Sequence, residues 1–110
     1  MQQNNVQLVG YVGGDPLISI LANGGKKARI RVATHHPMKK NEDGEKKEYA
    51  TTWHDIVAWD ETADYAERSF VKGSHIMIQG KLLYRTYVDK KGVVRSVAEV
   101  RASSLVNLDR

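Results

Sequence analysis

Two tryptophans and an aspartate lie two and four positions apart in one short segment. The flat rings of the tryptophans could stack on other flat rings. The segment spans residues 51–59 and reads Thr-Thr-Trp-His-Asp-Ile-Val-Ala-Trp. Strand side chains repeat with a period of two, so Trp53, Asp55 and Trp59 would share one face with Val57. A single tryptophan is more often core than exposed. Two interpretations follow: the tryptophans are core and Asp55 is paired, or they are exposed for a purpose.

A stripe of cations shortly before this segment favours exposure. Lys27, Arg29 and Arg31 alternate with three apolar residues, so all three cations would face outward from one strand. An ordinary solvated strand face is the alternative interpretation. Three cations with no acid between them favour contact with a polyanion, as does the formal net charge of +4.

Rings and cations interleave a second time, in the segment Tyr-Arg-Thr-Tyr at residues 84–87. Single-stranded nucleic acid needs a cationic groove for its backbone together with flat rings on which its bases stack. The candidate stacking rings are Trp53, Trp59, Tyr84 and Tyr87, and the candidate backbone contacts are Lys27, Arg29, Arg31, Lys39, Lys40, Lys72 and Arg85. Their joint occurrence predicts a domain that binds single-stranded nucleic acid.

Catalytic and metal chemistry find little support in the sequence. The serines lack the tight-turn context of a nucleophile, and the two Gly-Gly pairs lack the spacing of a phosphate-binding loop. His35 and His36 would point to opposite faces of a strand, and no third ligand stands near them. We therefore expect no enzymatic activity, no cofactor and no bound metal.

Targeting signals and cysteines are missing from the sequence as well. The chain has no cysteine, which excludes disulfides and fits a cytoplasmic protein. No apolar run approaches the ~20 residues of a membrane span, and the first residues do not resemble a secretory signal. We expect no membrane association.

The hydrophobic pattern predicts a single domain over residues 1–110, built mainly of strands. One short helix is expected over 62–70, with Asp60 as its N-cap and Gly73 as its C-cap glycine. Strands are expected over 5–12, 27–34, 51–59, 76–87 and 93–106, with a short apolar stretch at 17–22 and a polar hairpin tip at 35–47. Five strands with one helix between the third and fourth indicate an all-β oligonucleotide-binding (OB-fold) barrel.

Motifs along nearly the whole chain resemble the bacterial single-stranded DNA-binding protein (SSB) family. They include Asn-x-Val-x-Leu-Val-Gly near the N-terminus, Thr-Trp-His at 52–54, Lys-Gly-Ser at 72–74, Gly-Lys-Leu at 80–82 and Arg-x-Tyr at 85–87. The resemblance implies an OB-fold barrel that binds single-stranded DNA as a homotetramer and has no catalytic activity. It also implies roles in DNA replication, recombination and repair, in the bacterial cytoplasm and associated with the nucleoid.

The resemblance also assigns roles to single residues. Trp53 matches a base-stacking tryptophan, Trp59 takes the place of a stacking phenylalanine, and Tyr87 takes that of a tryptophan. A further stacking aromatic of the family falls near Met38, where this chain has no ring. His54 matches a histidine at the subunit contact of the family, in agreement with its facing away from the tryptophans.

The first strand predicts self-association. Val9 and Tyr11 would form a second apolar face that a small barrel cannot hide. Together with His54 they are the predicted subunit contacts of a homo-oligomer, expected to be a homotetramer.

Two features of the family bear on partners and alternatives. Family members often continue into a linker and an acidic tip that recruits repair and replication proteins, and we expect no such recruitment through this chain. A primosomal replication protein of the same fold is one alternative, and a barrel used only for protein contacts is another.

Overall fold

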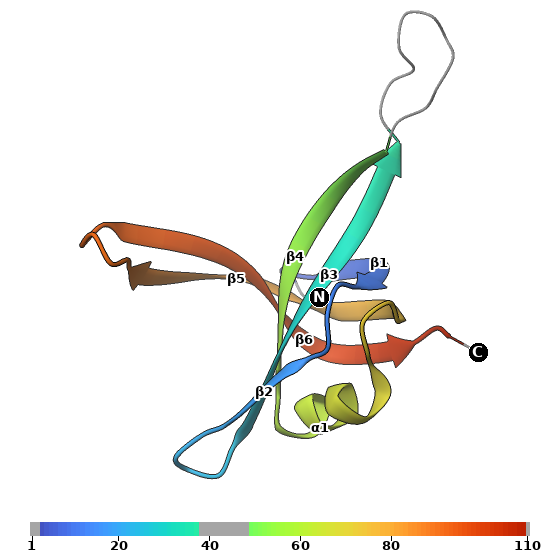
Figure 1. The fold of residues 1–110 in the computed structure, drawn as a ribbon, viewed down its shortest axis with the longest axis horizontal. Coiled ribbons are helices and arrows are strands. Elements are labelled where there is room, and N and C mark those ends of the chain that lie inside the picture. Colours follow the sequence, from blue (N-terminus) through green and yellow to red (C-terminus); the bar gives the residue numbers. More distant parts are fainter. Residues whose placement is uncertain (1–2, 38–48, 110) are drawn as a thin grey trace, which may run out of the picture.

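The computed structural model describes residues 3–37 and 49–109 and consists mainly of strands (Figure 1). In chain order the elements are β1 (Val6–Val12), β2 (Leu17–Ile20), β3 (Lys26–Pro37), β4 (Tyr49–Trp59), α1 (Asp60–Ser69), β5 (His75–Val88) and β6 (Val94–Asn107). The strands are joined in the order β1-β5-β6-β4-β3-β2, and a further pairing of β1 with β3 closes the sheet. Neighbouring strands are antiparallel except β4 and β6, which run parallel.

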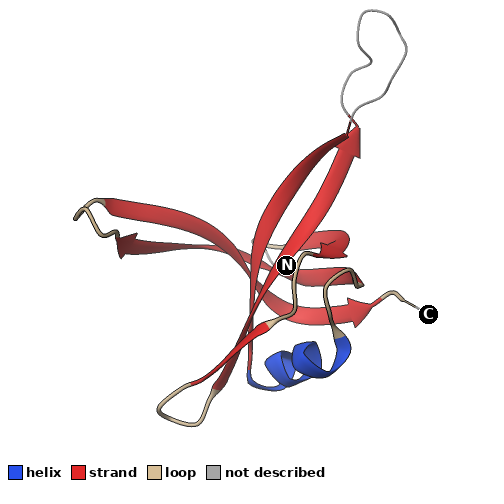
Figure 2. Cartoon of the chain, viewed as in Figure 1, coloured by secondary structure: helices blue, strands red, loops and turns tan. Residues whose placement is uncertain are grey.

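Five strands, namely β1, β3, β4, β5 and β6, form the closed barrel, and β2 lies against β3 outside that ring. The helix α1 follows β4 and precedes β5, and it packs at one end of the barrel (Figure 2). The predicted fold class, with one short helix between the third and fourth barrel strands, is thereby confirmed. Among the described residues, no helix is long and apolar enough to cross a membrane.

The core is apolar and follows the predicted alternation. Ala28, Ile30 and Val32 of β3 are buried, so the cations between them point to the outer face of the barrel. The helix contributes Ala63 and Ala66, which are fully buried. Burial on one side of each strand therefore fixes which residues remain on the outer face.

The start of α1 differs from the prediction. Trp59 holds the N-cap position without a side-chain hydrogen bond. Asp60 is the first residue of the helix and has a positive φ of 50°. The Asp60 carboxylate instead accepts a hydrogen bond from the backbone N–H of Lys26 at 3.1 Å. The prediction of Asp60 as N-cap was wrong, because its carboxylate joins the helix to β3.

The end of α1 also differs. The C-cap is Phe70, whose N–H donates to the carbonyl of Ala66 at 3.1 Å. Gly73 has a φ of 91° but lies in the following turn, where its N–H donates to the carbonyl of Val12 at 2.7 Å. The prediction of Gly73 as C-cap was wrong, because its left-handed backbone serves the turn that returns the chain to the barrel.

Two hairpins extend from the barrel as arms (Figure 1). The β5–β6 arm starts where Gly80 pairs with Ala102, one residue out of step with the pairing of Gln79 to Ser104. The extra residue, Ser103, makes a β-bulge, which bends a sheet locally. A Cβ on Gly80 would overlap the backbone of Arg101, so only glycine fits at this bend.

The second arm is formed by β3 and β4, whose pairing continues to Pro37 and Tyr49. The strands therefore run further than predicted, into the segment expected as a hairpin tip. The remainder of that tip, with the predicted contacts Lys39 and Lys40 and the position near Met38, lies outside the described residues.

Candidate nucleic-acid interface

The predicted cations and tryptophans share one face of the β3–β4 ladder. The register pairs Lys27 with Trp59, Arg29 with Val57, Arg31 with Asp55 and Ala33 with Trp53. Directly paired residues of an antiparallel ladder project to the same side of the sheet. We call this side the ring-and-cation face, defined by Lys27, Arg29, Arg31, Trp53, Asp55 and Trp59.

Trp53 is a surface residue, with 48% of its area exposed. The guanidinium carbon of Arg31 lies 4.8 Å from the centre of its ring, within range of a cation–π contact. Trp53 and Arg31 line a hollow of about 360 Å³ together with Gly13, Gly14, Asp15, Leu17, Arg29 and Asp55. The interpretation of Trp53 as a core residue therefore does not hold.

Trp59 is half-buried and lies between two cations of neighbouring strands. The Lys27 amine is 5.1 Å from its ring centre, and the guanidinium carbon of Arg101 on β6 is 5.9 Å away. Trp59 and Arg101 also line an open hollow of about 890 Å³, together with Lys81 and residues at the start of α1. The sequence analysis missed Arg101, although its register with Val57 places it on the same face.

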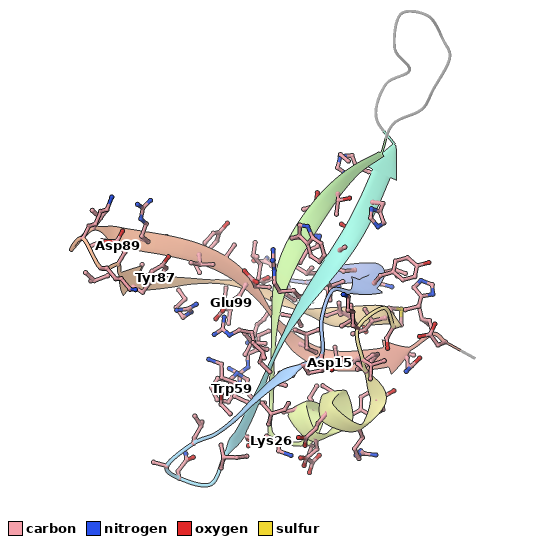
Figure 3. All side chains as sticks on the ribbon, in the orientation of Figure 1. Asp15, Lys26, Trp59, Tyr87, Asp89 and Glu99 are labelled. Carbon is pink, nitrogen blue, oxygen red and sulfur yellow. The ribbon has the colours of Figure 1, made fainter. Side chains whose placement is uncertain are left out.

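The β5–β6 arm continues the ring-and-cation face. Arg85 places its guanidinium carbon 5.7 Å from the ring of Tyr87, and Tyr87 pairs with Arg95 on β6. Figure 3 shows Tyr87 on the arm and Glu99 nearer the barrel, where the arm begins. Cations and an exposed ring are thus adjacent on the arm as well as on the barrel.

Tyr84 does not join these residues. It is 70% exposed and pairs with Ala98, one position out of phase with Arg85 and Tyr87. The alternation of β5 therefore places Tyr84 on the opposite side of the arm. The structure brings Tyr87 to the ring-and-cation face and leaves Tyr84 on the reverse face.

Two acids lie among the cations of this face. Asp55 is 3.7 Å from Arg31, so the carboxylate between the tryptophans is paired with a neighbouring cation. Glu99 of β6 lies 3.7 Å from Arg29 and 3.5 Å from Arg85. The two carboxylates reduce the electrostatic repulsion between cations that lie close together on this face.

Lys72 lies beside the hollow at Trp53. Its backbone N–H donates to the carboxylate of Asp15 at 2.9 Å, and Asp15 lines that hollow. The side chain of Lys72 is exposed. The turn after α1 thus adds one cation at the border of the ring-and-cation face.

The predicted subunit contacts do not form one patch within the single chain. Val9 and Tyr11 are 49% and 47% exposed, and the ring of Tyr11 stacks on His75 at 4.7 Å. His54 pairs with buried Val32, so it faces the other way, and its Nε2 lies 2.8 Å from the hydroxyl of Thr34. Burial lowers the pKa of His54 from its ordinary value, and the nearby charge of Asp55 opposes this more weakly.

Comparison with known proteins identifies the family of this arrangement. A profile of the Single-strand binding protein family matches residues 3–108. The chain belongs to this family. The structure is also similar to one described as a Plasmodium falciparum SSB complex with ssDNA, with a TM-score of 0.86 and 28% sequence identity over 99% of this chain and 97% of that chain. The resemblance to the SSB family and the OB fold are confirmed.

Proposed function

We propose that this protein binds and protects single-stranded DNA without regard to sequence, in DNA replication, recombination and repair. The observation that carries the proposal is the ring-and-cation face, where Trp53 and Trp59 each lie within 6 Å of a cation. Every base offers a flat surface to stack on such rings, and the phosphates of the DNA backbone offer negative charge to the cations. The family and the similarity to an SSB described in complex with ssDNA support the proposal.

The described elements favour single strands over duplex. A duplex is read by a helix or ribbon inserted in a groove, and its bases are already stacked on each other. Trp53 is exposed and Trp59 is half-buried, and α1, the one helix among the described residues, packs on the barrel through buried alanines. The exposed rings therefore match bases that have no partner.

Removing a tryptophan tests the face. Trp53→Ala and Trp59→Ala should each weaken binding to oligothymidine by about 1–3 kcal/mol, the effect of losing one stacked base, while the fold stays intact. Affinities from fluorescence anisotropy and thermal unfolding midpoints measure both quantities. An unfolded variant with no selective loss of binding would show that the residue stabilises the core instead.

The β5–β6 arm provides a matched pair for the same assay. Tyr87→Ala should weaken binding, and Tyr84→Ala should leave it close to that of the unchanged protein. Both tyrosines are exposed and belong to one strand, but only Tyr87 shares the side of Arg85. Equal losses in both variants would show that DNA contacts both sides of the arm.

We further propose that the protein acts without catalysis, in the cytoplasm of a bacterial cell alongside the nucleoid. Membership of the Single-strand binding protein family supports the absence of catalysis. A labelled oligonucleotide incubated with the protein and Mg²⁺ should remain at full length.

We propose a homotetramer as the working assembly. The exposed Val9 and Tyr11 support a subunit contact, because apolar side chains on a strand face commonly mark one. Several barrels on one strand of DNA would also raise avidity through effective concentration.

Light scattering at micromolar protein should give a tetramer mass, whereas a dimer mass would favour the primosomal alternative. His54→Tyr should shift the mass towards monomer.

A further inference from the structure

Glu99 is an acid in the middle of the ring-and-cation face, and it contacts one cation of the barrel and one of the β5–β6 arm. It lies on β6 opposite Leu83 of β5, where the β5–β6 arm meets the barrel (Figure 3). Its Oε2 atom is 3.7 Å from a guanidinium nitrogen of Arg29 and 3.5 Å from one of Arg85. Arg29 belongs to β3, which is separated from β6 by β4 in the sheet. The carboxylate therefore joins a cation on the barrel part of β3 to a cation on the β5–β6 arm.

The surroundings of this carboxylate are unfavourable for an acid. The Glu99 side chain is only 12% exposed, and its Oε2 accepts no hydrogen bond from any residue that the structure describes. A buried carboxylate without hydrogen bonds is usually costly, and ion pairs compensate for only part of that cost. Stability alone does not account for an acid at this position.

Within the described part of the chain, the two arginines keep most of their donors free. Each guanidinium carries five N–H groups, and Glu99 faces one nitrogen of each. Both arginine side chains remain open to solvent on the face that carries the rings. The guanidinium carbon of Arg85 also lies 5.7 Å from the ring centre of Tyr87. A phosphate bound by Arg85 would therefore lie next to a base stacked on Tyr87. Guanidinium groups held in this way match the oxygens of a phosphate.

We propose that Glu99 is a positioning residue of the DNA-binding face, which holds Arg29 and Arg85 together where the β5–β6 arm meets the barrel, so that both contact the same stretch of DNA backbone. The inference rests on the proposed binding of single-stranded DNA to this face. Without Glu99, the two arginines repel each other and sample many rotamers, and DNA binding must order them anew.

The direction of the change in affinity separates positioning from simple charge. An acid close to a DNA track repels phosphate, so removing its charge raises affinity if charge is its only effect. A positioning acid gives the opposite result. Glu99→Gln should weaken binding to oligothymidine by roughly two- to tenfold, the effect of ordering one to two flexible side chains.

Two comparison variants sharpen the experiment. Glu67→Gln removes the same charge outside the ring-and-cation face, on α1, where Glu67 pairs with Lys26 at 2.7 Å and its side chain is 47% exposed; this change should not lower affinity. Glu99→Asp keeps the charge and shortens the side chain, and it should weaken binding as Glu99→Gln does. Arg29→Ala should reduce affinity by a smaller factor in the Glu99→Gln protein than in the unchanged protein.

The measurements are anisotropy titrations at several salt concentrations, with thermal unfolding as the control for folding. Unfolding midpoints close to that of the unchanged protein are expected, because both arginines can be solvated once the carboxylate is gone. Equal or tighter binding by Glu99→Gln and Glu99→Asp overturns the proposal. If the unchanged protein binds oligothymidine and Trp53→Ala weakens that binding, equal or tighter binding by the Glu99 variants overturns only the role of Glu99. If the unchanged protein does not bind and Trp53→Ala has no effect, the binding face itself was wrongly assigned.

Discussion

Trp53 keeps an exposed ring in a fixed place because two neighbours hold it without covering it. Arg31 lies over the ring, and the backbone of Gly13 lies against it so closely that a Cβ on this glycine would overlap the ring. Gly13 cannot easily withdraw, since its N–H donates to the carbonyl of Arg31 at 2.8 Å. A base that stacks on Trp53 therefore meets a ring whose position is already set.

Gly13→Ala should displace the Trp53 ring and weaken oligothymidine binding by about 1 kcal/mol, with an upper limit near the 1–3 kcal/mol of one stacked base. Tryptophan fluorescence in the free protein should change with it. Gly14→Ala is the matched control, because a Cβ there meets no atom within 4 Å. Equal affinities for both variants would show that the glycine does not position the ring.

The chemistry of these residues could be predicted from the sequence only in part. Alternation placed Trp53 and Trp59 on one face of their strand and the three cations on the outer face of another, and residue type predicted stacking. The register of β3 with β4 brings the two sets to a common face. Tyr84 was grouped with Tyr87 by closeness in the sequence, although its odd spacing puts it on the other side of the strand. Glu99 and Arg101 went unnoticed as site residues because their roles depend on the pairing of β6 with β4, which no local pattern reveals.

At the scale of elements, the two arms depend on features that the sequence marks unequally. The sequence shows a glycine at residue 80, but the bulge that turns β5 and β6 out of the barrel depends on Ser103, an unremarkable residue in the sequence. The segment Asp-Lys-Lys-Gly at residues 89–92 has the residue types of a turn. Its carboxylate has a larger role than a turn requires.

Asp89 organises the tip of the β5–β6 arm through one carboxylate. It accepts hydrogen bonds from the N–H groups of Lys91 and Val93 and from the Nε of Arg95, at 2.9 to 3.0 Å. The backbone bond from Val93 is the largest cause that lowers the pKa of Asp89 from its ordinary 3.8, followed by the bond from Arg95. Because the folded pKa is lowered, the tip is stabilised above pH 3.8 and loses that support as the pH falls through the lowered value.

Amide exchange of Val93 should therefore accelerate when the pH is lowered through that range, beyond the intrinsic pH effect. Asp89→Ala should produce the faster exchange already at neutral pH and remove the extra acid dependence. Lys72, whose N–H donates to Asp15 in a different turn, is the internal control within the same variant. Unchanged exchange at Val93 in Asp89→Ala would contradict this role of the carboxylate.

At the scale of the whole molecule, a closed barrel with arms keeps a broad outer face free while a small core holds the strands. The core follows from alternation alone, as the buried Ile30, Ile56 and Ile78 show. The closure of β1 onto β3 joins residues that lie 20 and 22 positions apart. The order of strands and helix indicated a barrel, but no local pattern gave this pairing. The proposed homotetramer depends on surfaces such as Val9 and Tyr11, which are exposed in the single chain.

Titration of the intrinsic tryptophan fluorescence with oligothymidine and with a duplex, at increasing salt, tests whether the ring-and-cation face binds single-stranded DNA by stacking and charge. We predict quenching by the single strand, much weaker binding of the duplex, and a logarithm of affinity that falls with the logarithm of salt by about 0.7 per phosphate neutralised. Affinity that is independent of salt, or equal binding of duplex and single strand, would show that the face does not bind single-stranded DNA by stacking and charge.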